Sequence, residues 1–139
     1  MVEITTTYEG QLRCRATHGP SKNELITDAP ADNMGKGEAF SPTDLVATAL
    51  VTCIVTTIGI VAQRKGFEIA SMRAHVEKHM SDDAPRRIVK LPVKIWISLP
   101  ADHPERALIE KAAHNCPVHQ SVRSDIEMPI EFVWEGIDG

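Results

Sequence analysis

Two cysteines of this 139-residue chain lie in surroundings that suit thiol chemistry. Cys53 lies near the middle of a long uncharged stretch, and Cys116 directly precedes a proline that is well placed to begin a helix. Amide groups at a helix start favour a thiolate, so we expect this position to lower the pKa of Cys116. If the two side chains meet, one thiol can attack a peroxide and the other can resolve the product as a disulfide.

Neither thiol has to be reactive. Free cysteine is among the most buried residue types and usually behaves as a small apolar side chain, which is an alternative for Cys53. We expect Cys14, on a predicted strand, to be a packed bystander. The distance in sequence between Cys53 and Cys116 does not establish whether they meet.

The histidines suggest a metal site that we consider and set aside. Cys116 and His119 have CxxH spacing, and His75 and His79 are two further potential ligands. CxxH alone is common by chance, and His75 and His79 lie on a predicted strand whose inward positions we expect to be the even-numbered apolar ones. We therefore expect no metal and no other cofactor.

The stretch 40–66 must position Cys53, and its ends predict one helix. Ser41, Pro42 and Asp44 provide a cap hydroxyl, a proline at the first turn and a first-turn carboxylate, and residues 64–66 provide two cations and a glycine stop. Such a helix would be about 35 Å long. Its apolar residues cover every face, which predicts a helix that is buried all round.

A membrane span is the alternative for this stretch. The run without charge, residues 45–62, is just long enough to cross a bilayer. Four threonines interrupt it and no aromatic belt flanks it, so we expect no membrane association.

The segments before and after the helix are read from alternation and turn residues. Residues 2–16 alternate with a break at Gly10, which predicts two short strands or one strand with a kink at the glycine. Residues 18–23 form a turn and residues 24–27 a returning strand, which together predict an N-terminal hairpin, and a loop then leads to the helix. Further elements are predicted after it: strands over 67–80 and 87–99, a helix from Asp102 to about Cys116, a helix over 117–125 and a strand over 127–135. This order predicts a single α+β domain over residues 1–139, with antiparallel sheets wrapped around a long buried central helix.

Composition excludes several partners. A net charge of −4 and the lack of a basic run give no field for nucleic acid. The N-terminus has no signal peptide pattern, and three widely spaced cysteines make no disulfide framework, so we expect a cytoplasmic protein.

Three segments resemble the OsmC/Ohr family of thiol-dependent hydroperoxide reductases. They are GKGEAF (35–40), SPTDLVATALVTC (41–53) and AAHNCPVHQSV (112–122). The resemblance covers nearly the whole chain, and the two cysteine contexts are its most specific parts. The sequence looks closest to the divergent OsmC-like branch of the family.

The resemblance implies an intertwined homodimer in which two long helices pack together and both chains build each site. It implies that Cys53 reduces an organic, hydrophobic hydroperoxide and becomes a sulfenic acid. Cys116 would then condense with it to a disulfide, which an external dithiol would reduce.

The family also uses an arginine of the N-terminal hairpin at the thiolate. Here Arg15 is favoured for that role, with Arg13 and His18 as alternatives. This group matters because an ordinary thiol is only a few per cent ionised at pH 7.

A glutamate at the helix start holds that arginine in the family, and this chain has Thr43 in its place. Asp44 and Glu38 are the nearest carboxylates, and we name both as candidates. A capping role is the alternative for Asp44. The departure keeps a second function open, an OsmC-fold dimer that binds a small molecule or is structural and has no efficient peroxidase turnover. A cation close to Cys53 would distinguish the peroxidase from the binding protein.

Overall fold

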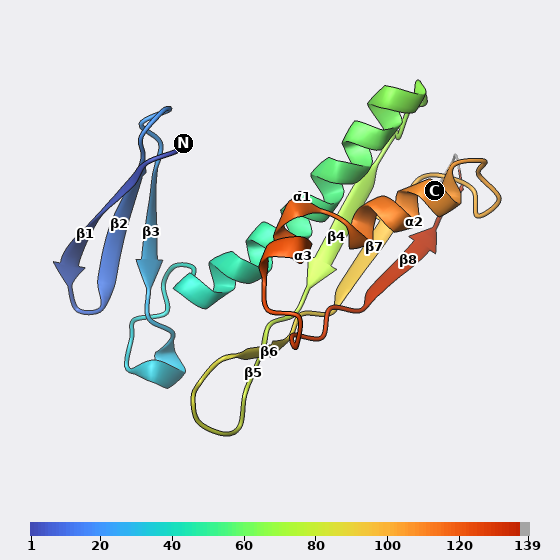
Figure 1. Ribbon diagram of the computed structural model, residues 1–139. Helices are drawn as coiled ribbons and strands as arrows, with labels where there is room; N and C mark the ends of the chain where they lie inside the picture. Colours follow the sequence, from blue (N-terminus) through green and yellow to red (C-terminus); the bar gives the residue numbers. More distant parts are fainter. Residues whose placement is uncertain (137–139) are drawn as a thin grey trace. The chain divides into compact units, whose positions relative to one another are not determined.

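The computed structural model describes residues 1–136, and its contacts group into two compact units. The first unit comprises residues 1–46 and the second begins at Ala47. The strands of the first unit form a sheet of their own, separate from those of the second (Figure 1). The mixed α+β class that the sequence predicts is confirmed. The single domain stays a prediction.

The first unit is built on a three-stranded antiparallel sheet. Its strands follow one another as β1 (Ile4–Gly10), β2 (Arg13–His18) and β3 (Glu24–Asp28). The break predicted at Gly10 is a two-residue turn, in which Gln11 and Leu12 both have positive φ, at 55° and 62°. Two left-handed residues give the turn the twist that matches its strands. The N-terminal hairpin is therefore confirmed.

A folded loop connects this sheet to the long helix. It contains the short helix η1 (Ala31–Asn33), and the backbone N–H of Asp28 donates to the carbonyl of Phe40 at 3.1 Å. A Cβ atom at Gly35 would lie 1.8 Å from the carbonyl oxygen of Ala29, so only glycine fits there.

Helix α1 (Pro42–Lys65) begins and ends where local signals place it. The backbone N–H of Ser41 donates to the Asp44 carboxylate at 2.9 Å, and the backbone N–H of Asp44 donates to Ser41 Oγ at 3.1 Å. This reciprocal pair is a capping box. Gly66, at φ 75°, ends the helix with its N–H on the carbonyl of Ala62.

The expectation that α1 is buried all round is wrong for this chain, because a single stripe is buried. Its members recur every three or four residues: Ala47, Leu50, Ile54, Ile58 and Ala62. Thr52 and Thr56 are exposed on another face, and Ile60 is 41% exposed. Helix α1 is long and apolar enough to cross a membrane. Core helices of soluble proteins often have the same length and composition.

The second unit contains a mixed sheet and a small hairpin. Its strands are β4 (Met72–Val76), β5 (His79–Met80), β6 (Ile88–Lys90), β7 (Val93–Ile97) and β8 (Ile130–Trp134). The sheet has the order β4-β7-β8, in which β4 is antiparallel and β8 parallel to β7, and β5 pairs with β6. The two predicted strands after α1 each divide in two, and Pro92 lies at the break between β6 and β7, since it cannot donate to the ladder.

The two short helices differ from their predicted bounds. Helix α2 (Arg106–His114) begins four residues later than the predicted start at Asp102. Two successive turns precede it, in which the N–H of His103 donates to the carbonyl of Pro100 and the N–H of Arg106 donates to the carbonyl of His103. Helix α3 (Pro117–Ser121) ends four residues early, because Val122 is extended at ψ 164°.

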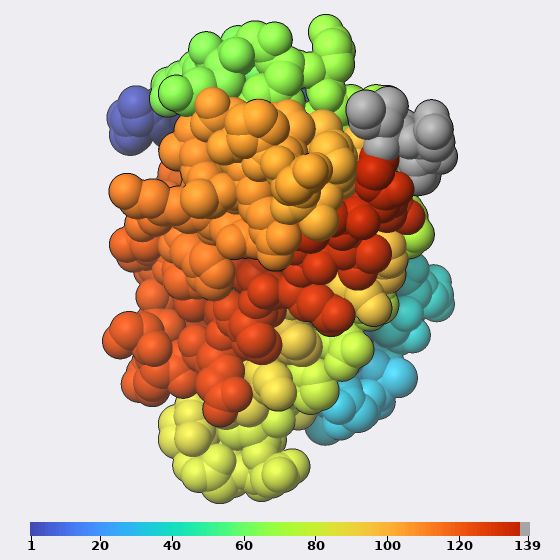
Figure 2. Space-filling view, turned by 90° about the vertical axis from the view of Figure 1, so that its right-hand side faces the viewer, coloured from blue at the N-terminus to red at the C-terminus, as the bar shows by residue number. Residues whose placement is uncertain are grey.

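One apolar core joins α1 to the sheet and to α2. The buried stripe of α1 packs with the inward side chains of β7, Val93, Ile95 and Ile97, and with Ile109 and Ala113 of α2. Figure 2 shows α2, α3 and β8, in orange and red, covering one face of this unit. Cys53 and Cys116 both belong to this core, Cys116 fully and Cys53 at its margin.

Candidate functional site

The structure brings Cys53 and Cys116 together. Both are free thiols of the same core, and Cys53 lies close enough to Cys116 to raise the pKa of its thiol. Cys53 is the twelfth of the 24 residues of α1, and Cys116 caps α3 from 63 residues further along the chain. A thiol pair in contact can be oxidised to a disulfide if its geometry relaxes to bonding distance.

Local sequence explains the orientation of Cys116. Its backbone is extended, at φ −64° and ψ 149°, and Pro117 begins α3 at the next residue. Its Sγ accepts the backbone N–H of His119 at 3.4 Å, and the residue is fully buried. The side chain is therefore an N-cap that points back into the core.

The expected low pKa of Cys116 is wrong. Burial has the largest effect and raises the pKa of this thiol; the His119 N–H lowers that pKa by less, and the neighbouring Cys53 thiol raises it by less again. Helix α3 has only five residues, so its dipole does not offset the loss of solvent. Cys116 thus keeps its proton at neutral pH, and it can donate that proton towards Cys53.

An open groove runs along α1 beside Cys53. Its volume is about 590 Å³. It is lined by Ala49, Thr52, Cys53, Thr56, Thr57, Ile60, Arg64, Pro117 and Val118. Cys53 is half-buried and borders the groove, whereas Cys116 is fully buried and does not. A molecule in the groove can therefore reach the sulfur of Cys53 but not that of Cys116.

Arg64 is the one cation among the described residues that line the groove. It lies 11 residues after Cys53, and at about 100° and 1.5 Å per residue this places it on nearly the same side of α1, about 16 Å away along the axis. From the sequence, Arg64 is expected only to be a cation at the end of the helix. The spacing from Cys53 is the signal that could have placed it on the groove.

The first unit holds an ionic cluster centred on Arg13. Its guanidinium donates to both carboxylate oxygens of Asp28, at 2.7 and 2.8 Å, and to Glu38 at 3.3 Å. Asp28 is buried, and it also accepts the backbone N–H of Glu38 at 3.2 Å. The hydrogen bond from Arg13 holds the pKa of Asp28 below its usual value, and the same bond raises the pKa of Arg13.

Asp28 was not predicted from the sequence to be a site residue. The signal is in the β2-β3 register, where Arg13 and Asp28 are direct cross-strand partners. The predicted strand ended one residue earlier, at Thr27, and so left Asp28 in the loop.

The remaining candidate residues of the first unit have local partners. Arg15 pairs with Glu9 at 2.9 Å and approaches Glu24 at 4.0 Å. Asp44 is engaged in the capping box, and the hydroxyl of Thr43 lies 3.1 Å from that of Ser41. The roles of Arg15, Asp44 and Glu38 at the thiols stay predictions.

In the part of the chain that the structure describes, no group of three or more His, Cys, Asp or Glu residues has an arrangement that could hold a metal ion. His79 and His75 both face Glu77, at 2.9 and 3.8 Å. His119 contributes its backbone N–H to Cys116, and its ring lies edge-on to that of His114.

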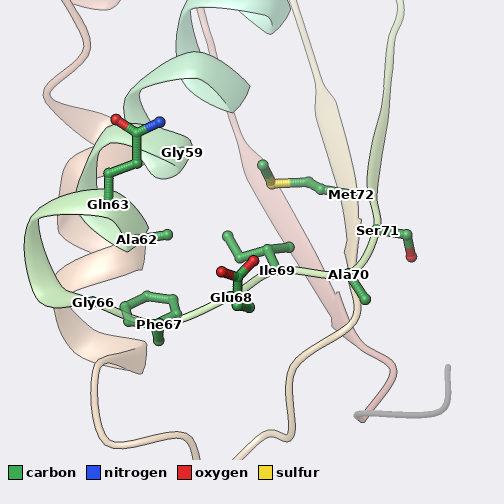
Figure 3. Close-up of a pocket in the computed structure, with 10 residues that line it drawn as sticks. All are labelled: Gly59, Ala62, Gln63, Gly66, Phe67, Glu68, Ile69, Ala70, Ser71 and Met72. Carbon is green, nitrogen blue, oxygen red and sulfur yellow. The ribbon is translucent and has the colours of Figure 1, made fainter.

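A second hollow of about 610 Å³ lies where α1 ends and the chain turns into β4 (Figure 3). It is lined by Gly59, Ala62, Gln63, Gly66, Phe67, Glu68, Ile69, Ala70, Ser71 and Met72. Glu68 is its one charged side chain, and no cysteine borders it. Thiol chemistry therefore belongs to the groove beside Cys53.

Comparison with solved structures gives close matches over nearly the whole chain. An osmotic stress induced and detoxification response protein from Psychrobacter arcticus is 43% identical, with 96% of each chain covered and a TM-score of 0.89. An organic hydroperoxide resistance protein OsmC from Legionella pneumophila is 16% identical over 95% of this chain and 96% of its own, with a TM-score of 0.77. One from Elizabethkingia anophelis is also 16% identical, over 96% of both chains, with a TM-score of 0.78.

The two hydroperoxide resistance proteins are too distant in sequence to show more than a common fold. Among proteins with curated descriptions, none matches the sequence. The sequence profile of OsmC-like proteins matches residues 35–131, a range that contains Cys53, Cys116 and the whole of α1. Together with the relative from Psychrobacter arcticus, this match shows that the chain belongs to the family of OsmC-like proteins.

Proposed function

We propose that the protein is a thiol-dependent peroxidase that reduces organic hydroperoxides, with Cys53 as the attacking thiol and Cys116 as the resolving thiol. The observation that carries this proposal is the contact between a half-buried thiol on an open groove and a second thiol buried behind it. Apolar groups in the groove, Ala49, Ile60 and Val118, suit a hydrophobic peroxide better than hydrogen peroxide.

The reaction has two steps on the protein. The Cys53 thiolate attacks the outer oxygen of the peroxide, the O–O bond breaks, and the alkoxide takes a proton and leaves as an alcohol. Cys53 is then a sulfenic acid. The Cys116 sulfur attacks the Cys53 sulfur, an S–S bond forms, and hydroxide leaves as water with the proton of Cys116.

An external dithiol completes the cycle. Its two thiols exchange with the disulfide, so two electrons pass to the protein and the dithiol becomes a disulfide. Because Cys116 is fully buried in the core, we propose that the first thiol of the external dithiol attacks the sulfur of Cys53.

We propose an arginine of the N-terminal hairpin as the cation that favours the Cys53 thiolate. The family resemblance favours Arg15. Arg13 resembles the family arginine in another way, because carboxylates hold it, here Asp28 and Glu38. Substituting each arginine by glutamine, and measuring the rate of Cys53 oxidation, distinguishes the two.

We also propose a cytoplasmic homodimer in which the open face of α1 packs against a second copy. Its support is the apolar side chain of Ile60, 41% exposed on that face. The mass of the protein in solution, measured by light scattering, tests this arrangement.

A binding protein without efficient turnover is the second candidate. One observation favours it: among the described residues lining the groove the single cation, Arg64, lies about 16 Å from Cys53 along α1. The groove alone would be enough to bind a small apolar molecule.

Trapping of the sulfenic acid tests the proposal against this alternative. Cys116→Ser is treated with one equivalent of cumene hydroperoxide in the presence of dimedone, and the labelled cysteine is identified by peptide mass spectrometry. We expect dimedone on Cys53, and Cys14→Ser in the same background is the matched control. If Cys53 stays unlabelled and no peroxide is consumed, the result would favour the binding protein.

A further inference from the structure

We propose that Arg64 acts on the thiol of the other subunit: in a two-fold homodimer, the guanidinium of each Arg64 lies beside the Cys53 sulfur of its partner. This inference rests on the proposed function, whose homodimer it uses, and it adds a residue that the partner contributes to the site. Neither the sequence nor the family resemblance gives Arg64 a role at the thiols, since the arginine that the resemblance implies belongs to the N-terminal hairpin.

The side of α1 that borders the groove is suited to packing against another helix. Ala49, Cys53, Thr57, Ile60 and Arg64 follow one another along it at spacings of four, four, three and four residues, which keep side chains on one side of a helix. Ile60 is exposed, and the hydroxyl of Thr57 is bound to the carbonyl of Cys53 at 2.8 Å, which leaves the Thr57 methyl group for a contact. A second copy of α1 can therefore cover this side with apolar contacts.

Charge restricts how the second copy can lie. Arg64 makes no hydrogen bond or ion pair with any residue in the described part of the chain, whereas six other arginines hold a carboxylate: Arg13, Arg15, Arg73, Arg87, Arg106 and Arg123. A guanidinium that is covered by a partner without an anion is costly. The described residues that line the groove include no carboxylate, and Cys53 is the one among them that can become an anion. The thiolate of Cys53 is therefore the counter-ion that this side offers.

Two-fold symmetry can bring the two groups together. In an antiparallel pair of α1 helices whose symmetry axis passes midway between positions 53 and 64, Cys53 lies opposite the partner's Arg64 and Thr57 lies opposite the partner's Ile60. Packed helices lie about 8–10 Å apart, a gap that facing side chains fill. A parallel pair would instead set the two guanidinium groups against each other. The separation of about 16 Å within one chain thus becomes a contact between chains.

The contact would promote the first step of the reaction. A guanidinium beside a cysteine sulfur favours the thiolate, which is the form that attacks a peroxide. Because the contact occurs twice in a two-fold dimer, both copies of Cys53 gain a cation. Pro117 and Val118 border the groove from α3 rather than from α1, so the approach to Cys53 from that side stays open.

Cross-linking tests the contact. Arg64→Cys is combined with Cys14→Ser and Cys116→Ser, so that Cys53 is the one natural thiol left, and the protein is oxidised with diamide. Within one chain the two positions are about 16 Å apart along α1, whereas the Cα atoms of a disulfide lie at most about 7 Å apart. A disulfide between Cys53 and the introduced thiol must therefore join two chains. We expect a covalent dimer on a non-reducing gel.

Gln63→Cys and Lys65→Cys in the same background are matched controls, because each position lies one residue from Arg64 and points about 100° to one side. We expect both to cross-link about tenfold more slowly, or not at all, since their sulfurs point away from the partner's Cys53. Equal rates at the three positions would overturn the inference, and so would a wild type that is monomeric by light scattering.

A reactivity assay tests the charge without any peroxide. The rate of Cys53 alkylation by iodoacetamide is measured against pH in wild type, Arg64→Gln, Arg64→Lys and the adjacent control Lys65→Gln. We expect Arg64→Gln to move the profile up by about one pH unit, which makes alkylation about tenfold slower at pH 7. Arg64→Lys should retain part of the effect, and Lys65→Gln should leave the profile unchanged. Identical profiles for wild type and Arg64→Gln would overturn the inference.

Mixed dimers show which subunit supplies the cation. A chain with Arg64→Gln and a chain with Cys53→Ser carry different tags, are co-expressed and are purified as the heterodimer. Its single Cys53 faces the intact Arg64 of the other chain, so we expect alkylation at the wild-type rate. In the control heterodimer the Cys53→Ser chain also carries Arg64→Gln, and the rate should stay about tenfold lower. A heterodimer as slow as this control would show that Arg64 does not act on the partner's thiol.

These results are separable from a failure of the proposed function. If the cross-link and the rescue in the heterodimer are found but no peroxide is consumed, Arg64 has the proposed place and the protein is not a peroxidase. If Cys53 forms its sulfenic acid equally fast in wild type and Arg64→Gln, the protein is a peroxidase and the role of Arg64 is refuted.

Discussion

The difference in exposure between Cys53 and Cys116 predicts a difference in their reactivity. Cys53 borders the open groove, while Cys116 is 0% exposed and is held by the His119 N–H. A small alkylating reagent such as iodoacetamide should therefore modify Cys53 in the folded protein and reach Cys116 only after α3 opens locally.

The size of the effect follows from the contacts that opening breaks. The hydrogen bond from His119 contributes about 1 kcal/mol, and removal of a small apolar side chain from the core costs about 1 kcal/mol more. A total of about 2 kcal/mol corresponds to alkylation of Cys116 that is about 30-fold slower than that of Cys53. The raised pKa of Cys116 acts in the same direction, since it lowers the thiolate fraction.

Timed alkylation followed by peptide mass spectrometry measures both rates in one sample. Pro117→Gly is a useful comparison, because it loosens the first turn of α3 and should raise the rate at Cys116 relative to that at Cys53. Equal rates at the two cysteines of the folded wild type would refute the placement of Cys116 in the core.

Two further predictions concern stability. Ile95→Ala removes a fully buried side chain and should lower the free energy of unfolding by about 2–5 kcal/mol, whereas Ile4→Ala, at a residue 66% exposed, should change it by about 0.5 kcal/mol or less, both measured by urea unfolding. Asp28→Asn should destabilise at pH 7, and its difference from wild type should shrink below about pH 4, because the lowered pKa of Asp28 gives stability that is lost as pH falls. A pH-independent difference would contradict the ion pair with Arg13.

Local signals predicted the ends of α1 well. Ser41 and Asp44 act through hydrogen bonds within one turn, and Gly66 acts through its own backbone. Such features need no knowledge of the tertiary structure, which is why the helix agrees with its predicted bounds almost to the residue.

Burial was predicted less well, because it depends on which elements meet. The apolar residues of α1 surround the whole helix, and only the packing of β7 and α2 selects the buried stripe. The pKa of Cys116 has the same origin. Its place at a helix start is visible in the sequence, but the core that raises its pKa is not.

Only part of the candidate site was predicted, because the groove also depends on which elements meet in the folded chain. The surroundings of Cys53 and Cys116 in the sequence identified both residues, the resemblance gave them roles, and the structure adds their proximity and the groove. Arg64 was not predicted as a site residue, because the groove that it borders is partly lined by Pro117 and Val118, more than 50 residues further along the chain.

Intact and peptide mass spectrometry of the wild type after one equivalent of an organic hydroperoxide tests the central claim most directly. The account predicts rapid formation of a disulfide between Cys53 and Cys116, with Cys14 left reduced. Cys53 and Cys116 that both remain reduced in excess peroxide, or a disulfide that joins either of them to Cys14, would contradict it.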